Sequence, residues 1–471
     1  MATTLNTIAL DLGTTAIKAA ICNNRSQIEE TFSIPAPTIS AEQGHYVSNA
    51  MEYLSITGRL LKKCQNICQK KQLLGICYQR SSFLVWNSTS GLPVTKLISW
   101  QDNSGQASCI ELIKHNPLIR ELSGLPLTPY YFAPKLRTLL QQQPELWPSI
   151  ANKTLLIGTL DSFIIWHWTA RRHFLTDTSM AARTLLMDIH SGQWSKTLGD
   201  IFAIPIKILP KIQPSTNLNL ALNHDTILKV SIADQSAALL ANVTFTNNDE
   251  SEILVNLGTG GFVSRSEPKQ SNKTIDNYLR TLVYQDHQRN QIIAIEGTIN
   301  SITAALQLYP FQTCKIKDLA NIADIFCIAE PTGIGAPFFR SDIKMQFSKP
   351  VEHLSKEQIA CLLLEAIIFR VALILEDFNQ RPDKTRIYLS GGLSNSSCLQ
   401  QGIANCSTSP VFKVLQRQSS LQGTAILINN LAPTTYRQSE AVIKTKHKPL
   451  VEKYQQWKIW FKNFGFLSPP I

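Results

Sequence analysis

The 471-residue sequence lacks several patterns that assign a chain quickly to a known class of site. It has no Gly-x-Gly-x-x-Gly loop between a strand and a helix and no Gly-Lys-Ser/Thr sequence, which excludes the Rossmann and Walker nucleotide loops. None of its ten cysteines forms a Cys-x-x-Cys pair, so the common zinc and dithiol motifs are excluded as well. Any phosphate chemistry must therefore use another kind of loop.

Long runs of one kind of residue are also missing. The net charge of +11 would attract anions such as nucleotides, nucleic acid or membrane phosphates, but the Lys and Arg residues are scattered, so we expect no nucleic-acid partner. There is no uninterrupted apolar run of about 18 residues and no basic and apolar leader pattern, so we expect no membrane segment and a cytoplasmic location. A homodimer and a homotetramer both stay open.

The length and the hydrophobic fraction of 44% fit two α/β domains better than one core. We predict an N-terminal domain at residues 1–247 and a C-terminal domain at residues 248–471, with a cleft between them. This division follows a repeat, because a strand, a Gly-Thr turn and a second strand occur in each half of the chain.

The first of these hairpins consists of the strand Thr7–Asp11, the turn Gly13–Thr15 and the strand Ile17–Cys22. Gly13 permits a tight turn, and the exposed N–H groups and threonine hydroxyls can hold phosphate oxygens. Asp11 can hold a hydrated Mg²⁺, because this ion keeps several waters and touches few protein carboxylates. The turn is a candidate first phosphate element.

The second hairpin and two later positions complete the candidates. The turn Gly258–Gly261 would supply donors for a second phosphate element. Asp234 follows a predicted strand and precedes an apolar helix, which leaves two interpretations open: it caps the helix, or it accepts a substrate proton while Gln235 bonds the substrate. The turn at Gly391 and Gly392 would let a flat ligand approach the backbone.

Short motifs in a fixed order resemble the FGGY family of carbohydrate kinases over nearly the whole chain, with the glycerol kinase pattern closest in the first domain. The motifs are Asp11-Leu-Gly-Thr-Thr15, Tyr78-Gln-Arg80, Ser99-Trp-Gln-Asp102, Gly124-Leu-Pro-Leu-Thr-Pro-Tyr130, Lys135-Leu-Arg137, Thr176 to Leu186, Ala233-Asp-Gln235, Leu257 to Phe262, Glu296-Gly297, Gly333 to Pro337, Ser390-Gly-Gly392 and Gln422-Gly-Thr424.

The resemblance implies two actin-like (ribonuclease H-like) ATPase domains, ATP and Mg²⁺ as cofactors, and γ-phosphate transfer to a hydroxyl of glycerol or a related small polyol. Asp234 would be the general base and Asp11 the metal residue. The implied nucleotide positions are Gly13, Thr14, Thr15, Lys18, Gly258, Thr259, Gln307, Gly391, Gly392 and Ser396. The implied substrate positions are Arg80, Trp100, Tyr130, Asp234, Gln235 and Phe262.

The sequence departs from the glycerol kinase pattern at four positions. Ser81 replaces a Glu that would bond substrate hydroxyls, Lys18 replaces an Arg, Thr303 replaces a small Gly and Ser396 replaces an Asn. These departures motivate two alternatives, a ketose kinase acting on xylulose or sedoheptulose and a catalytically weak sensor. An actin-like chaperone ATPase fits less well, because the substrate positions around Arg80 suit a small polyol.

Overall fold

The computed structural model describes residues 6–42, 45–68, 71–244, 251–267, 277–340, 342–379, 381–416 and 418–464. The chain forms two compact units, and neither is continuous in sequence. Unit 1 contains Met1–Ala241, Arg280–Ile293 and Gln418–Tyr436, and unit 2 contains Asn242–Leu279, Ala294–Arg417 and Arg437–Ile471. The predicted domain boundary at residues 247 and 248 lies outside the described residues and stays a prediction.

Unit 1 is built on a six-stranded sheet with the order β14-β15-β6-β1-β2-β3. The strands are β1 (Asn6–Leu12), β2 (Ala16–Cys22), β3 (Ile28–Pro35), β6 (Gln72–Tyr78), β14 (Leu220–Ala221) and β15 (Thr226–Ala233). β1 and β2 form the predicted hairpin, with Asp11 opposite Lys18. β15, β6 and β1 run parallel, so their carboxyl ends meet at one edge of the sheet.

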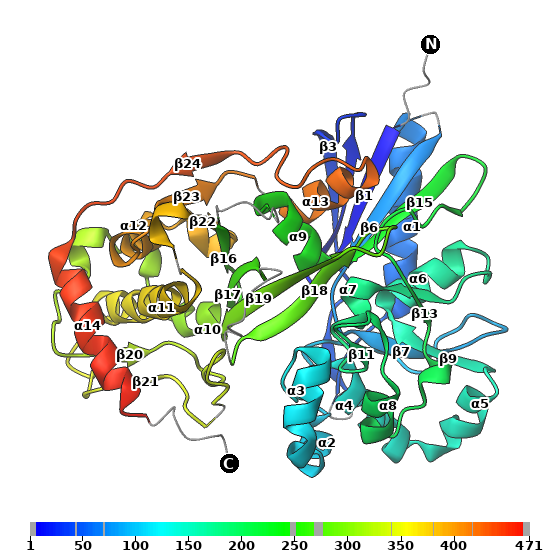
Figure 1. The fold of residues 1–471 in the computed structure, drawn as a ribbon, viewed down its shortest axis with the longest axis horizontal. Helices are drawn as coiled ribbons and strands as arrows, with labels where there is room; N and C mark the ends of the chain where they lie inside the picture. Colours follow the sequence, from blue (N-terminus) through cyan, green and yellow to red (C-terminus); the bar gives the residue numbers. More distant parts are fainter. Residues whose placement is uncertain are drawn as a thin grey trace. The chain divides into compact units, whose positions relative to one another are not determined.

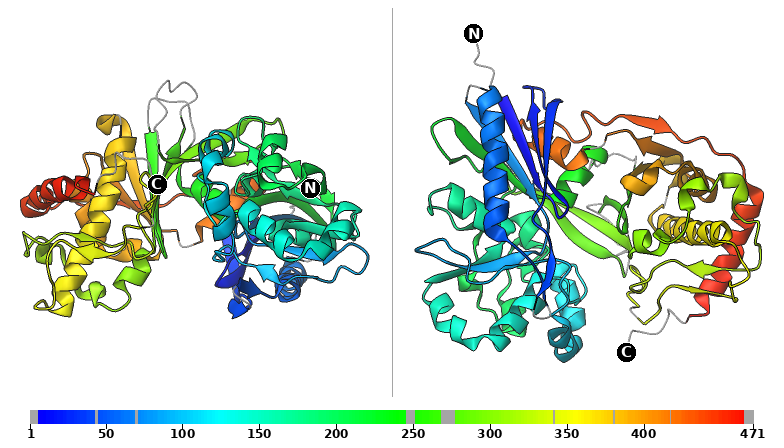
Figure 2. Two further views of the ribbon diagram at one scale, coloured as in Figure 1. Left: turned by 90° about the horizontal axis from the view of Figure 1, so that it is seen from below. Right: turned by 180° about the vertical axis from the view of Figure 1, so that it is seen from behind.

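Side-chain alternation along β1 directs two helices to opposite faces of this sheet. Ile8 and Leu10 belong to the same buried cluster as the apolar side of α1 (Ala50–Cys68), whereas Ala9 is buried with residues of α13 (Ser419–Ile428). Small residues let α13 approach closely, since a Cβ atom at Gly75 would lie 2.6 Å from Thr424 Cγ2. Figure 2 shows α1 lying across its face of the sheet.

The rest of unit 1 carries the segments that flank the candidate site. A second sheet has the order β4-β5-β8-β7-β9, and short helices surround it. Its strands are β4 (Ser40–Glu42), β5 (His45–Ser48), β7 (Phe83–Asn87), β8 (Leu97–Ile98) and β9 (Leu155–Thr159), and the helices include α4 (Phe132–Gln142), α7 (Thr178–Ala181) and α9 (Asp234–Asn242).

A seven-stranded sheet has the order β18-β19-β17-β16-β22-β23-β24, in which β17, β16, β22 and β23 belong to unit 2 and most of β18 falls in the Arg280–Ile293 segment of unit 1. The strands are β16 (Ser251–Leu257), β17 (Gly261–Ser266), β18 (Leu279–Gln285), β19 (Gln291–Ile299), β22 (Thr385–Ser390), β23 (Val411–Val414) and β24 (Ser439–Ala441), and the helices are α10 (Ile302–Leu306), α11 (Lys356–Phe378), α12 (Ser397–Cys406) and α14 (Lys448–Lys462). β16 and β17 form the second predicted hairpin.

The central helix α11 begins at a capping box, in which the Ser355 hydroxyl accepts from the Gln358 N–H and the Gln358 side chain accepts from the Ser355 N–H. In the part of the chain that the structure describes, α11 is the one helix long and apolar enough to span a membrane, with a mean hydropathy of 2.2. Of that window, 83% is buried inside the protein, as in a core helix.

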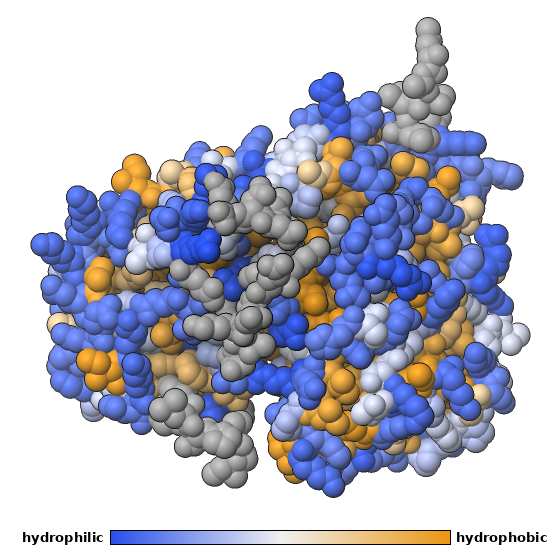
Figure 3. Space-filling view, viewed as in Figure 1, coloured by the Kyte–Doolittle hydropathy of each residue, from blue (hydrophilic) through white to orange (hydrophobic). Residues whose placement is uncertain are grey.

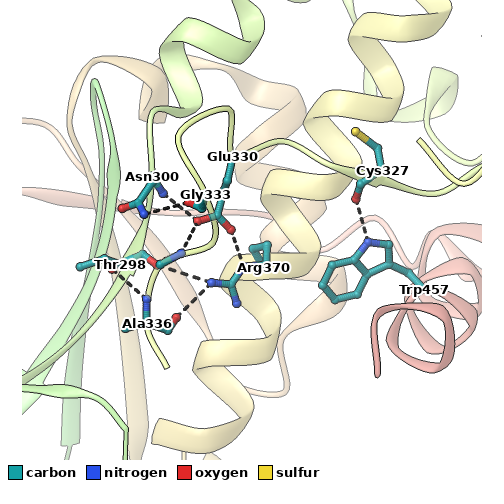
Figure 4. Close-up of polar contacts among 9 residues, drawn as sticks. Thr298, Asn300, Cys327, Glu330, Gly333, Ala336, Arg370 and Trp457 are labelled. Carbon is teal, nitrogen blue, oxygen red and sulfur yellow. Dashed lines mark hydrogen bonds and ion pairs between the residues drawn. The ribbon is translucent and has the colours of Figure 1, made fainter. Parts of the chain in front are cut away.

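A buried ion pair joins α11 to two loops of unit 2 (Figure 4). Arg370 Nε donates to Glu330 Oε1 at 2.7 Å, and neither side chain is exposed by more than 1%. Glu330 Oε2 accepts from the N–H groups of Asn300 and Gly335, each at 2.8 Å. The network therefore fixes the loop that leads into α10. On the face drawn in Figure 3, hydrophilic residues predominate and apolar residues form small patches.

Candidate functional site

Three candidate segments meet at the carboxyl edge of the unit 1 sheet. Leu12 of β1 lies opposite Tyr78 of β6, and Tyr78 lies opposite Ala233 of β15. The residues that follow these strands, from Gly13, from Gln79 and from Asp234, therefore leave the sheet side by side. The sequence predicted the strand ends before Gly13 and before Asp234 separately, and the strand register brings them together with the Tyr78-Gln-Arg80 motif.

Hydrogen bonds link the first phosphate turn to the predicted substrate segments. Trp100 Nε1 donates to Thr14 Oγ1 at 3.0 Å, and Thr14 Oγ1 donates to Gln79 Oε1 at 3.2 Å. Gln79 Nε2 donates to the Tyr53 hydroxyl at 2.9 Å, which donates in turn to the Gly13 carbonyl at 3.2 Å. Sequence reasoning missed Gln79 and Tyr53 as parts of the site, although Gln79 stands inside a motif.

Asp11 lies near the end of β1, and one oxygen of its carboxylate, Oδ1, is buried without a hydrogen-bond donor among the described residues. Burial raises the Asp11 pKa to about 7, the negative charge of Asp234 adds to this, and Lys18 opposes it. A divalent cation at this oxygen would offset both unfavourable effects, so the residues present fit Mg²⁺. Lys18 Nζ also donates to Gln418 Oε1 at 3.2 Å.

Asp234 is the first residue of α9, and its Oδ1 accepts the N–H of Gln235 at 2.7 Å. Burial raises the Asp234 pKa, while the positive charges of Arg80 and Arg183 lower it. The carboxylate is therefore under the electrostatic influence of two guanidinium groups. Arg183 was not predicted as a site residue, and the signal available was one cation within a run of small and apolar residues after Asp177.

The predicted aromatic positions of unit 1 are partly open to solvent. Tyr130 is 47% exposed and Trp100 is 37% exposed, so their rings are available to a ligand rather than buried in the core. Ser81, which replaces the expected Glu, is buried in a left-handed conformation with φ of 61°. Its hydroxyl donates to the Arg183 carbonyl at 3.0 Å, so the position holds the backbone and carries no charge.

The second Gly-Thr turn, in unit 2, is supported from α10. Thr303 Oγ1 donates to the Gly258 carbonyl at 2.7 Å, and the Thr303 N–H donates to the Thr259 carbonyl at 3.3 Å. The threonine noted as a departure is thus a support for this turn. Phe262 lies on β17, and Gln307 caps the carboxyl end of α10, one turn beyond Thr303.

The Gly391 turn lies at the same sheet edge as the second Gly-Thr turn, because Asn256 of β16 is in register with Ser390 of β22. Gly391 has φ of 89°, and a Cβ atom there would lie 2.4 Å from Asn256 Oδ1 and from the Leu257 carbonyl oxygen. A Cβ atom at Gly392 would meet nothing within 4 Å, which leaves room for a flat ligand.

The remaining nucleotide candidate, Ser396, caps α12 with its hydroxyl, which accepts the Leu399 N–H at 3.4 Å. Within the described ranges there is no group of three or more His, Cys, Asp or Glu residues that could hold a metal ion. A metal would therefore rely on Asp11 and on ligand oxygens.

Two comparisons with known sequences match most of the chain. Models of the N-terminal and the C-terminal domain of the FGGY family of carbohydrate kinases match residues 6–235 and residues 253–430. The chain is 26% identical to the glycerol kinase of Mycoplasma pneumoniae over 456 residues, which cover 89% of this chain and 88% of that protein. It is 28% identical to the glycerol kinase of Mycoplasma genitalium, with 84% and 83% covered.

Solved structures show the same fold. The glycerol kinase of Plasmodium falciparum with ADP matches with a TM-score of 0.83 and 18% identity, covering 99% of both chains. The gluconate kinase of Lactobacillus acidophilus matches with a TM-score of 0.80 and 17% identity, covering 98% of this chain and 99% of that one. The prediction of two actin-like α/β domains is thereby confirmed.

Proposed function

Since the chain belongs to the FGGY family of carbohydrate kinases, we propose that it transfers the γ-phosphate of ATP to a hydroxyl group of glycerol or a related small polyol. The observation that carries this proposal is the shared sheet edge at which the Gly13 turn, Arg80 and Asp234 emerge. The relatives with glycerol kinase names at 26% and 28% identity support the small polyol.

Asp234 would accept the proton of the attacking hydroxyl. Its pKa is raised by burial, which makes the carboxylate a better base, while the charges of Arg80 and Arg183 lower the pKa and favour the ionised form. Gln235 and Arg80 would hold the substrate hydroxyls, while the exposed rings of Trp100 and Tyr130 would pack against the carbon chain. Phe262 would contribute a further apolar contact.

The two Gly-Thr turns would donate hydrogen bonds to the phosphate oxygens of the nucleotide as charge develops during transfer. Asp11 would hold Mg²⁺, which supplies charge neutralisation at the phosphates when it is bound. The turn at Gly391 and Gly392 would receive the adenosine, with Gln307 and Ser396 beside the nucleotide. We place the reaction in the cytoplasm, since all ten cysteines are free thiols.

The test is an ADP-release assay with Mg-ATP and a panel of glycerol, xylulose, sedoheptulose and other polyols. Glycerol or a small polyol is expected to give the highest kcat/KM. Asp234→Asn keeps the acceptor oxygen for the Gln235 N–H but removes the base, so kcat should fall about 10² to 10⁴-fold while ATP binding is retained. Full turnover in this variant would contradict the role of Asp234.

The same panel decides between the alternatives that the Ser81 departure motivates. Preference for a ketose over glycerol would replace the substrate part of the proposal and keep the chemistry. ATP binding without turnover on any substrate would favour the sensor. Support of the second phosphate turn by Thr303 is compatible with nucleotide binding in both cases, so turnover is the readout that separates the kinase from the sensor.

A further inference from the structure

A buried lysine on α4 makes contacts that the proposed chemistry does not use. Lys135 is 1% exposed, and its Nζ donates to the Ser81 carbonyl at 3.2 Å and to the Ser99 carbonyl at 2.8 Å. Taking an ammonium group out of water is costly unless its hydrogen bonds are replaced. Asp102, also fully buried, is the carboxylate whose charge acts on Lys135.

The two carbonyl groups belong to residues adjacent to predicted substrate positions. Ser81 follows Arg80, and Ser99 precedes Trp100. The helix that carries Lys135 begins at Phe132, two residues after Tyr130. One side chain thus joins three segments that come from different parts of unit 1.

The Arg80 segment needs such a restraint. Ser81 is a non-glycine residue at φ of 61°, a conformation that is sparsely populated for such residues. Two hydrogen bonds hold Ser81 in this conformation. Its backbone carbonyl accepts from Lys135, and its side-chain hydroxyl donates to the Arg183 carbonyl. The neighbouring segment is held in the same way, because the Trp100 N–H donates to Ser82 Oγ at 2.9 Å.

We propose that Lys135 is a positioning residue of the substrate site, which fixes the backbone at Arg80 and at Trp100 relative to Tyr130. It acts through these neighbours and does not contact the substrate. The inference rests on the proposed kinase function and adds a determinant of polyol affinity to it. Nucleotide affinity should depend on it much less, because the carbonyl groups that Lys135 holds are beside the substrate positions and reach the first phosphate turn only through the Trp100 side chain.

The test is Lys135→Met, which keeps much of the side-chain volume and removes the donor group. The KM for the polyol should rise about tenfold or more, while the KM for ATP should stay within twofold of the wild type. Lys135→Arg retains donors for the two carbonyl groups and should recover part of the loss. If Lys135→Met does not fold, Lys135→Gln should still raise the polyol KM by about threefold.

Lys453 offers a matched control in unit 2. It is 3% exposed, its Nζ donates to the Ile322 carbonyl, and it pairs with Glu365. Lys453→Met should lower thermal stability without raising the polyol KM, which separates positioning from general destabilisation. An unchanged polyol KM in folded Lys135 variants would overturn the inference alone. A wild-type protein without turnover on the whole panel would instead overturn the proposed function and this inference with it.

Discussion

Burial changes the acidity of single side chains in this protein, and Lys135 shows the effect on stability. Burial lowers the Lys135 pKa to about 7, and the charge of Asp102 opposes this. Asp102 itself lies beside His45, with Nδ1 and Oδ2 3.4 Å apart. The folded state therefore favours a neutral lysine, whereas the unfolded chain keeps it protonated up to about pH 10.4.

Between pH 7 and about pH 10, the unfolded chain binds one more proton at this position than the folded chain does. The contribution of Lys135 to the free energy of unfolding should therefore rise with pH, by at most about 1.4 kcal/mol per pH unit. Below pH 7 both states are protonated and the contribution is constant. Denaturant unfolding of the wild type and of Lys135→Met at several pH values measures the difference. Parallel curves would contradict this assignment.

The positions of candidate side chains in the fold were predictable, and contacts to backbone atoms were not. Asp11 lies on the predicted first strand, Asp234 lies at the predicted junction of strand and helix, and Gly391 lies in the predicted turn, while their roles stay predictions. Lys135 stood inside a motif without a role, since the carbonyl groups it binds look the same at every position of a sequence.

The stability of unit 2 depends more on the buried ion pair between Glu330 and Arg370 than on its exposed ion pairs. Glu330→Gln would leave the buried Arg370 guanidinium without its counter-charge and would place an amide donor near two backbone N–H groups (Figure 4). Breaking a buried pair in this way costs about 3–5 kcal/mol. Thermal unfolding should show a clear decrease in Tm.

Asp342 provides the control for this element. Its side chain is 61% exposed, and it pairs with Arg340 at 2.6 Å. Asp342→Asn should change stability by at most about 1 kcal/mol, because solvent screens the pair. Similar losses of stability in the two variants would show that the buried Glu330 pair contributes no more to stability than the exposed Asp342 pair.

Periodic patterns within one element were read correctly from the sequence. The apolar periodicity from Lys356 to Asn379 predicts a long helix, which is observed as α11, Lys356–Phe378, and both predicted strand-turn-strand hairpins are present. The position of α13 was not predicted, although the motif at Gln422 was noted. Its partners on β1 and β2 are about 400 residues away, and no local pattern reports such a contact.

The chain returns to its first unit near its end, so unit 1 is complete only when α13 has been added. Gln422 Nε2 donates to the Ser26 carbonyl at 2.6 Å, and Ser26 Oγ donates to the Ala425 carbonyl at 2.7 Å. Leu421 and Ala425 bury the small side chains of the sheet on this face. The helix therefore covers β1, β2, β6 and β15 on one face of the sheet whose edge carries Asp11.

The packing of α13 on unit 1 is most sensitive to a substitution at Gly423. A Cβ atom at Gly423 would lie 1.8 Å from the Ala237 carbonyl oxygen of α9, so Gly423→Ala must displace α13 or the helix that begins at Asp234. We expect a loss of about 1–3 kcal/mol or more in stability and a parallel loss of turnover.

Gly58→Ala in α1 is the matched control, because its Cβ would meet nothing within 4 Å and alanine favours a helix by about 0.5–1 kcal/mol. Thermal unfolding of the two variants in the full chain compares them directly. Equal stability would mean that α13 does not dock on unit 1, whereas a decrease confined to Gly423→Ala would show that the last part of the chain completes the first.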